Sequence, residues 1–238
     1  MPITNIHEEV ALNISKQINN LDTKDFYLGN YAPDSVNLNS LAEKSLRWTA
    51  HQRKENRNEW RKSLKKFYND EKNNYPKNFI LGYITHILTD IIYDDFFYDD
   101  VTKQIKKDYP NEKDTHSIMG EDMAKYAYHS KYKTKVEEVL KDQDKFYDIL
   151  NISKDMMYKY KEKVLNERKN SDTNIYITED LIQKLSNKVL TELQEYIEDE
   201  VFFFYQFLTI LSFNVYYDMI NLFHKRVKYI LLKGVGLK

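Results

Sequence analysis

Glycine and proline are unusually scarce in this chain. The 238 residues include only 5 Gly and 4 Pro. Because these two residues form most tight turns, a chain with so few of them is poorly suited to the many turns of a β-sandwich or β-barrel. We therefore predict an all-α fold, a multi-helix bundle in which residues 1–238 form a single domain.

Hydrophobic periodicity and helix-start signals divide the chain into expected helices. Residues 19–40 contain Gly29 and Pro33, so we expect a loop there, packed inward through the apolar run at 26–29. Thr178, followed by two acidic residues, is expected to cap a helix. The helices are expected at 3–18, 41–70 with a break near 52–58, 76–107, 113–140, 142–170, 178–189 and 191–233.

The bulk charge and the termini restrict the class of partner and the location. Lys and Arg number 36 against 37 Asp and Glu, so no basic excess favours a nucleic-acid backbone, and we expect no stable nucleic-acid binding. The N-terminal residues lack the basic start and apolar stretch of a secretory signal, which predicts a cytoplasmic protein. The apolar stretch 201–223 includes Gln206 and Asp218, so we interpret it as a buried helix and expect no transmembrane segment.

A histidine and an aspartate occur one helical turn apart in the middle of the expected helix 76–107. His86 and Asp90 are separated by four residues, so both side chains project from nearly the same face of an otherwise apolar helix. Such a pair is either hydrogen-bonded within the core or binds one metal ion. Gly82, a turn earlier, leaves room for another backbone or a ligand. The chain has no Cys, so any metal must be bound by nitrogen and oxygen atoms.

Three further residues have ordinary interpretations when each is taken alone. His7 is expected at a surface or a helix start, Asp34 in a turn that it caps, and His51 on a surface helix. Their order along the chain is more informative. A histidine is followed by an aspartate in an LG-x-x-APD sequence (residues 28–34), by a second histidine, and by His-x-x-x-Asp within a helix.

These segments resemble the bacterial zinc-dependent phospholipase C family, and most closely its intracellular, uncharacterised hydrolase branch, which is related to secreted phospholipases and single-strand nucleases. The resemblance covers about the first 100 residues. It implies a helical bundle of the phospholipase C type that holds up to three zinc ions and hydrolyses phosphodiesters. The metal ligands that it implies are His7, Asp34, His51, His86 and Asp90, followed by His116 and His129.

Three departures from the family pattern reduce the expected number of metals. Lys133 stands where the family has a glutamate, with Glu121 or Asp122 as substitutes. The secreted relatives use a processed N-terminal amine as a ligand, and the related nucleases carry disulfides, which a chain without Cys cannot form. We therefore expect one or two zinc ions, with three as the upper limit.

The function that follows is zinc-dependent hydrolysis of a phosphodiester by metal-activated hydroxide, since zinc lowers the pKa of bound water to about 7. Asp34 is the candidate catalytic residue that orients or deprotonates the water. A phospholipid and a small or nucleotide-like diester are equally compatible substrates. The alternative is a non-catalytic helical protein with a structural or degenerate metal site.

Overall fold

The computed structural model describes residues 2–129, 133–166 and 175–197, and it gives only the backbone of 126–129 and 133–135. Across these ranges the structure contains helices and no β-strand, which confirms the all-α prediction. Met1–Leu193 forms one compact unit, and Gln194–Lys238 forms a second unit, of which only 194–197 are described. The expected apolar helix at 201–223 lies outside the described residues, so the single domain over 1–238 stays a prediction.

The described residues of the first unit contain α-helices and one 3-10 helix, and residues 179–197 are also helical. In chain order the elements are α1 (Thr4–Ser15), α2 (Lys24–Tyr31), η1 (Ala32–Asn37), α3 (Lys44–Ala50), α4 (Arg57–Glu71), α5 (Lys77–Phe96), α6 (Tyr98–Asp108), α7 (Thr115–His129), α8 (Lys133–Lys141) and α9 (Lys154–Asn166).

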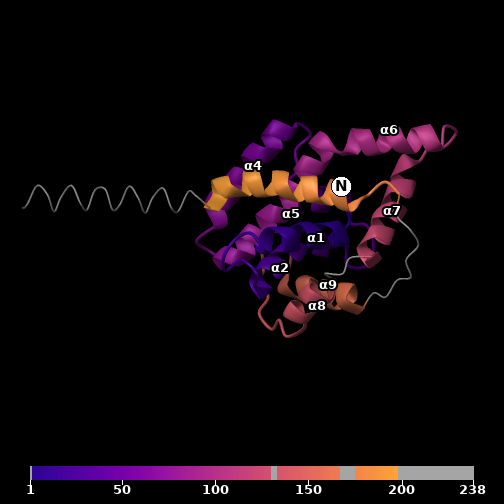
Figure 1. The fold of residues 1–238 in the computed structure, drawn as a ribbon. Coiled ribbons are helices and arrows are strands. Elements are labelled where there is room, and N and C mark those ends of the chain that lie inside the picture. Colours follow the sequence, from indigo (N-terminus) through magenta and orange to yellow (C-terminus); the bar gives the residue numbers. More distant parts are fainter. Residues whose placement is uncertain (1, 130–132, 167–174, 198–238) are drawn as a thin grey trace, which may run out of the picture. The chain divides into compact units, whose positions relative to one another are not determined.

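Helix α5 is the central element of this unit. It begins directly after Pro76, and residues 79–93 are all buried. Helices α1, α2 and α4 pack around it (Figure 1). A helix that is mainly apolar on all sides is stable only when other elements surround it. The few polar side chains that such a helix buries need partners in the core. His86 and Asp90 are two of those side chains.

The contact between α2 and α5 depends on two glycines. A Cβ atom added at Gly29 would overlap the carbonyl oxygen of Phe79, and one added at Gly82 would overlap the carbonyl oxygen of Phe26. The two backbones can therefore approach closely only where no side chain lies between them. The expectation that Gly82 admits another backbone is confirmed.

Several expected boundaries need correction. Residues 19–40 are not a loop, because Thr23 accepts a hydrogen bond from the Phe26 amide (3.2 Å) and starts α2, which continues into η1. The break near 52–58 is confirmed, whereas the helix expected at 76–107 is divided at Phe97. The helix expected from 142 begins only at Lys154, and 179–197 is helical throughout. Thr178 caps it by accepting a hydrogen bond from the Leu181 amide, as expected (3.2 Å).

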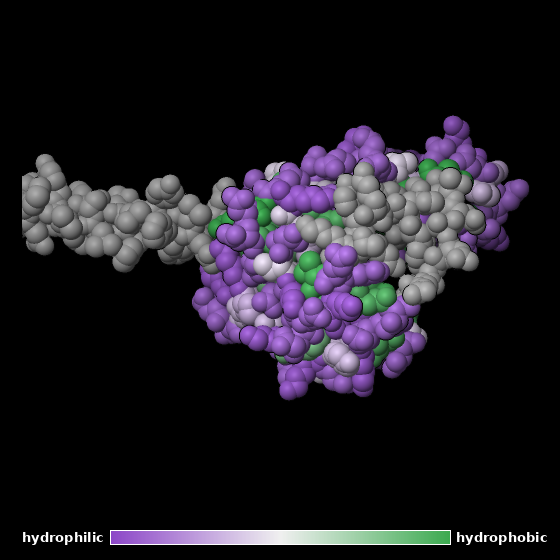
Figure 2. Space-filling model, turned by 60° about the horizontal axis from the view of Figure 1, so that its bottom comes forward, coloured by the Kyte–Doolittle hydropathy of each residue, from purple (hydrophilic) through white to green (hydrophobic). Residues whose placement is uncertain are grey.

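Hydrophilic residues cover most of the described surface on the face shown in Figure 2, and hydrophobic residues form small separate groups there. Among the described residues, no helix combines the length and apolar character needed to cross a membrane.

Candidate metal centre

Five side chains from separate parts of the sequence meet in the core of the first unit. His7 comes from α1, Asp34 from η1, His51 from the residue that ends α3, and His86 and Asp90 from α5. All five residues are buried. Their donor atoms form two overlapping groups of metal-binding type, one of His7, Asp34 and His86 and the other of His51, His86 and Asp90.

The imidazole and carboxylate atoms point at one another across short distances. The Nε2 atom of His7 lies 3.4 Å from Asp90 Oδ1, and His51 Nε2 lies 3.5 Å from Asp34 Oδ1. His86 Nε2 is 3.9 Å from both Asp34 Oδ1 and Asp90 Oδ2. The five groups thus surround one small volume into which nitrogen and oxygen lone pairs are directed.

The outer nitrogens of two imidazoles are fixed by backbone carbonyls. His86 Nδ1 donates to the carbonyl of Asn30 (2.7 Å), and His51 Nδ1 donates to that of Arg47 (2.9 Å). A carbonyl oxygen can only accept, so both Nδ1 atoms carry hydrogen and the neutral rings have lone pairs on Nε2. Those Nε2 atoms lie 3.3 Å apart. Two lone pairs at this separation repel unless a proton or a cation lies between them, and backbone support of a ring's outer nitrogen is typical of metal-binding histidines.

The backbone around His51 is held in place by the turn that ends α3. The Arg53 amide donates to the carbonyl of Trp48 (2.8 Å) and the Gln52 amide to that of Thr49 (3.1 Å), with Gln52 at a positive φ of 51°. This pattern closes a helix C-terminus through a left-handed residue. The Trp60 indole also donates to the carbonyl of His51 (2.8 Å). The direction of the His51 side chain is therefore set by its backbone.

His7 and Asp90 have polar atoms that lack hydrogen-bond partners within the described structure. Both ring nitrogens of His7 and both carboxylate oxygens of Asp90 are buried without a hydrogen bond. The His7 ring stacks on His86, with 3.6 Å between centroids and 8° between planes. Buried polar groups without partners are costly, and a divalent cation would satisfy these atoms. The residues present therefore fit a metal ion.

The protonation states of these groups follow from burial and from their neighbours. Burial, reinforced by the charge of His7, lowers the pKa of His86 to about 3, so this ring is neutral at ordinary pH. Burial also acts to lower the pKa of His51, but the hydrogen bond to Asp34 and the charge of Asp90 outweigh it and raise that pKa. Burial opposes ionisation of both carboxyls, yet the imidazoles hold the pKa of Asp34 and of Asp90 below the usual range.

Asp34 connects the cluster to the neighbouring helices. Thr4 donates to Asp34 Oδ2 (3.0 Å), so the hydroxyl of Tyr160 on α9, 2.5 Å from Thr4 Oγ1, is the donor in that contact. Asn37 donates to Asp34 Oδ1 (3.5 Å). The Asp34 side chain is 12% exposed, whereas the side chains of His7, His51, His86 and Asp90 are at most 1% exposed. Asp34 is thus the acidic member of the cluster that solvent can reach.

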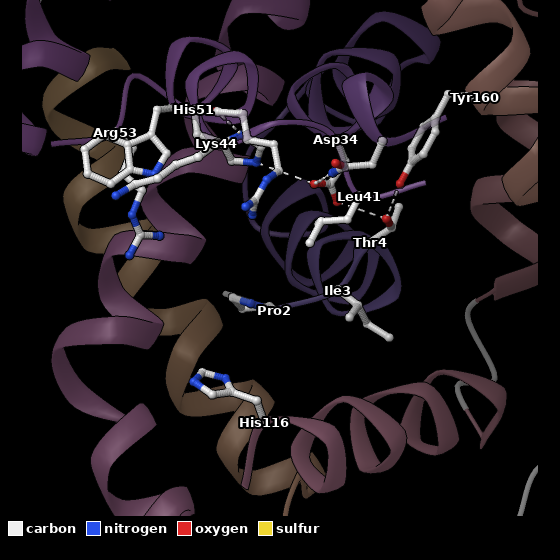
Figure 3. Close-up of a pocket in the computed structure, with 13 residues that line it drawn as sticks. Pro2, Ile3, Thr4, Asp34, Leu41, Lys44, His51, Arg53, His116 and Tyr160 are labelled. Carbon is white, nitrogen blue, oxygen red and sulfur yellow. Dashed lines mark hydrogen bonds and ion pairs between the residues drawn. The ribbon is translucent and has the colours of Figure 1, made fainter. Parts of the chain in front are cut away.

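A pocket of about 580 Å³ opens beside this exposed carboxylate (Figure 3). Asp34 and His51 line one part of it, and the side chains of Thr4 and Tyr160 stand beside Asp34. The complete lining is Pro2, Ile3, Thr4, Asp34, Asn37, Leu41, Lys44, Arg47, Trp48, His51, Arg53, His116 and Tyr160. A small molecule in this pocket would reach the edge of the candidate metal centre.

His116, the first of the later histidines of the resemblance, is not part of the described cluster. His116 at the start of α7 is exposed, lies across the pocket from Asp34 in Figure 3, and its Nε2 is 2.9 Å from the Tyr98 hydroxyl. The side chains of His129 and Lys133 lie outside the described residues. Metal binding by His116 and His129 therefore stays a prediction.

Asp122, one proposed substitute for the missing glutamate, is occupied elsewhere. Its carboxylate accepts hydrogen bonds from the backbone amides of Ile175, Tyr176 and Ile177, at 2.6, 2.8 and 2.7 Å. It serves to anchor this segment to α7. The other substitute, Glu121, is exposed.

Sequence reasoning did not identify the residues that orient the cluster. Asn30 and Arg47 act through their backbone carbonyl groups, which every residue has, so their side chains do not indicate this role. Asn30 does follow Gly29 in the LG-x-x-APD sequence. Tyr160 reaches Thr4 across 156 residues, and nothing in the local sequence marks either residue.

Comparison with known proteins gives one finding. No curated protein and no solved structure matches the chain. The sequence model of zinc-dependent phospholipase C matches residues 3–195, a range that includes all five clustered side chains. With most of its length matched and its histidines and aspartates gathered in the core of a helical fold, the chain belongs to the zinc-dependent phospholipase C family.

Proposed function

We propose that this protein hydrolyses phosphodiesters with a divalent metal, preferably zinc, held by His7, Asp34, His51, His86 and Asp90. The observation that supports this most is the 3.3 Å separation of His51 Nε2 and His86 Nε2. The Nδ1 atom of each ring donates to a backbone carbonyl, so both Nε2 atoms are left to face each other. Nitrogen and oxygen donors without thiolate suit zinc or a similar divalent ion.

The number of ions is limited by His86. Both groups of candidate ligands include this residue, and only its Nε2 is available to a metal because Nδ1 donates to Asn30. His86 can therefore bind one ion. We propose one ion bound through His86, and a second ion would rely on the carboxylates and the remaining imidazoles.

Zinc, when bound, supplies acidified water and neutralises charge on the phosphoryl group, which are the requirements of diester hydrolysis. The protein's own contribution is positional. Thr4 and Asn37 hold both oxygens of Asp34 at the edge of the pocket. From that position Asp34 can orient a water molecule or accept its proton, and the buried walls behind it limit access to the pocket side.

The test combines metal analysis with a diester assay. The purified protein is stripped with chelator, reloaded with zinc, and assayed with bis(p-nitrophenyl) phosphate and a short-chain phospholipid. We expect bound zinc at one to two ions per chain and turnover that disappears on stripping and returns on reloading. A His86→Gln variant should lose both zinc and turnover, whereas His116→Gln tests whether the exposed histidine contributes. Zinc-loaded protein that leaves every diester intact would refute the enzyme assignment.

A non-catalytic metal protein is the second candidate. The position of His116 favours it, because the described cluster contains only the ligands expected from the first 100 residues. A chelator-sensitive melting temperature together with intact diester substrates would identify this function. A cytoplasmic location remains part of either proposal.

A further inference from the structure

The pocket beside Asp34 is lined by basic side chains that are not candidate metal ligands. Lys44, Arg47 and Arg53 all line it. Arg53 is neutralised by Asp94, 3.0 Å away. Within the described part of the chain, Lys44 and Arg47 form no ion pair, and Asp34 is the only carboxylate among the residues that line the pocket.

Lys44 and Arg47 are tied to the candidate metal centre by α3. The positions 44, 47 and 51 are separated by three and four residues, so Lys44, Arg47 and His51 follow one side of this helix and its C-cap. Arg47 Nε donates to the Ala42 carbonyl (2.9 Å), which fixes the guanidinium. Its two terminal nitrogens have no partner among the described residues and can donate together to an anion.

The aromatic side chains of the pocket do not form a site for a quaternary ammonium group. Such groups bind over open aromatic faces. The Lys44 ammonium already lies over one face of the Trp48 ring, 4.3 Å from the ring centroid. The Tyr160 ring packs edge-on against Tyr31, and its hydroxyl donates to Thr4. A cationic headgroup would also meet the uncompensated charges of Lys44 and Arg47.

We propose that Lys44 and Arg47 form an anion-binding subsite next to the metal centre, so that the preferred substrate is a phosphodiester with a second anionic group. The cleavage step in this inference rests on the proposed function. The preference for a second anionic group rests on the charge of the pocket. Choline esters, whose headgroup is cationic, are expected to be poor substrates.

The preference is tested with two matched substrates and one contrasting substrate. Thymidine 5′-(p-nitrophenyl phosphate) and its 3′-phosphorylated form differ only in the second anionic group, and p-nitrophenylphosphorylcholine carries the cation. With zinc-loaded protein, we expect kcat/KM to be about tenfold higher for the 3′-phosphorylated substrate than for its parent, mainly through KM, in line with one or two partly exposed charge contacts. The choline ester should be cleaved most slowly.

Charge removal should abolish the preference without removing the metal. Lys44→Gln and Arg47→Gln should each lower the ratio of the two thymidine substrates, and the double variant should bring it close to one, with zinc content unchanged. Lys103→Gln removes a lysine that pairs with Asp100 on α6, and it should keep the ratio. A ratio that survives in the double variant, or a choline ester cleaved as fast as the 3′-phosphorylated substrate, would overturn the subsite.

A binding measurement separates this proposal from the proposed function. Thymidine 3′,5′-bisphosphate and thymidine 5′-monophosphate are titrated into the zinc-loaded protein and its double variant. Tighter binding of the bisphosphate in the wild type alone supports the subsite even if no diester is cleaved, and in that case only the hydrolase proposal fails. Equal affinity of the two nucleotides for the wild type would overturn the subsite, whatever the assays of turnover give.

Discussion

Gly82 of α5 lies so close to Phe26 of α2 that a Cβ atom at residue 82 would overlap the Phe26 carbonyl oxygen. The same hypothetical atom would lie 3.0 Å from the Asn30 amide nitrogen. Asn30 also supplies the carbonyl that fixes His86, one helical turn beyond Gly82. This glycine contact therefore determines how near α2 comes to the imidazole, and it links helix packing directly to the candidate metal centre.

Gly82→Ala should destabilise the protein and weaken metal binding together. The added methyl group must push α2 away from α5, and overpacking of this kind costs about 1–3 kcal/mol. Unfolding by denaturant, with and without zinc, measures both effects. Gly120→Ala is the matched control because a Cβ at Gly120, within α7, meets no atom within 4 Å. We expect that variant to be neutral or slightly more stable. Equal effects of the two substitutions would contradict the packing argument.

Asp90→Ala should remove metal and the stability that metal confers. Asp90 is fully buried, and its oxygens face His7, His51 and His86. Zinc at 100 times its Kd stabilises a folded protein by about 2.7 kcal/mol, so chelator should lower the wild-type melting temperature and leave that of the variant nearly unchanged. Asp70→Ala, which removes an exposed partner of Lys66, should respond to chelator like the wild type. If chelator shifts the Asp90 variant and the wild type equally, Asp90 is not a ligand.

Asp34→Asn should lower turnover by a factor of roughly 100 or more, the usual size of general-base effects. The amide keeps the shape of the side chain but removes its charge, and Thr4 can still donate to its oxygen. Zinc content, measured alongside turnover, separates the two roles. Loss of turnover with zinc retained indicates that Asp34 acts on the water, whereas loss of both indicates that it is a ligand. Unchanged turnover would remove Asp34 from the site.

Tyr160→Phe should lower turnover less than Asp34→Asn does, by up to about tenfold, because it removes one hydrogen bond from the chain that leads to Asp34. The ring contact with Tyr31 is kept. Tyr158→Phe, an exposed tyrosine on the same helix, is the control and should leave turnover unchanged. Equal turnover in the two variants would show that the hydroxyl of Tyr160 does not position Asp34.

Zinc binding should weaken on acidification and release protons near neutral pH. Because Asp34 and Asp90 raise the pKa of His51 above its ordinary value of 6.5, the metal-free ring keeps its proton to higher pH than a free histidine. Zinc must displace that proton, so zinc affinity falls as pH falls through the raised pKa. His86, whose pKa is about 3, releases none. Calorimetric titrations at pH 7 in two buffers of different ionisation enthalpy measure the release, and identical heats would contradict it.

The sequence predicted the parts of the site that depend on local spacing. The four-residue interval between His86 and Asp90 places both on one face of α5, and the structure agrees. Helix α2 was missed because Gly29 and Pro33 resemble turn residues, whereas Gly29 serves close helix packing and Pro33 lies in the first turn of η1. Local patterns report what a residue favours in isolation, so they do not reveal which distant backbone it will contact.

The supporting contacts were beyond prediction for a related reason. The link between Tyr160 and Thr4 joins residues 156 positions apart, and it exists only once α9 has packed near α1 and η1. Lys44 and Arg47 form no ion pair among the described residues, and the sequence could not predict this, because the net charge of -1 does not show where the individual charges lie.

All five converging side chains lie between positions 7 and 90, before the first residue of α6. Helices α6 to α9 contribute no member of this set among the described residues. Because a chain is synthesised from its N-terminus, all five side chains have been made before the first residue of α6 is added. A metal bound by this set would require only α1, η1, α3 and α5 to be packed together, so α6 to α9 could fold against a centre that is already assembled.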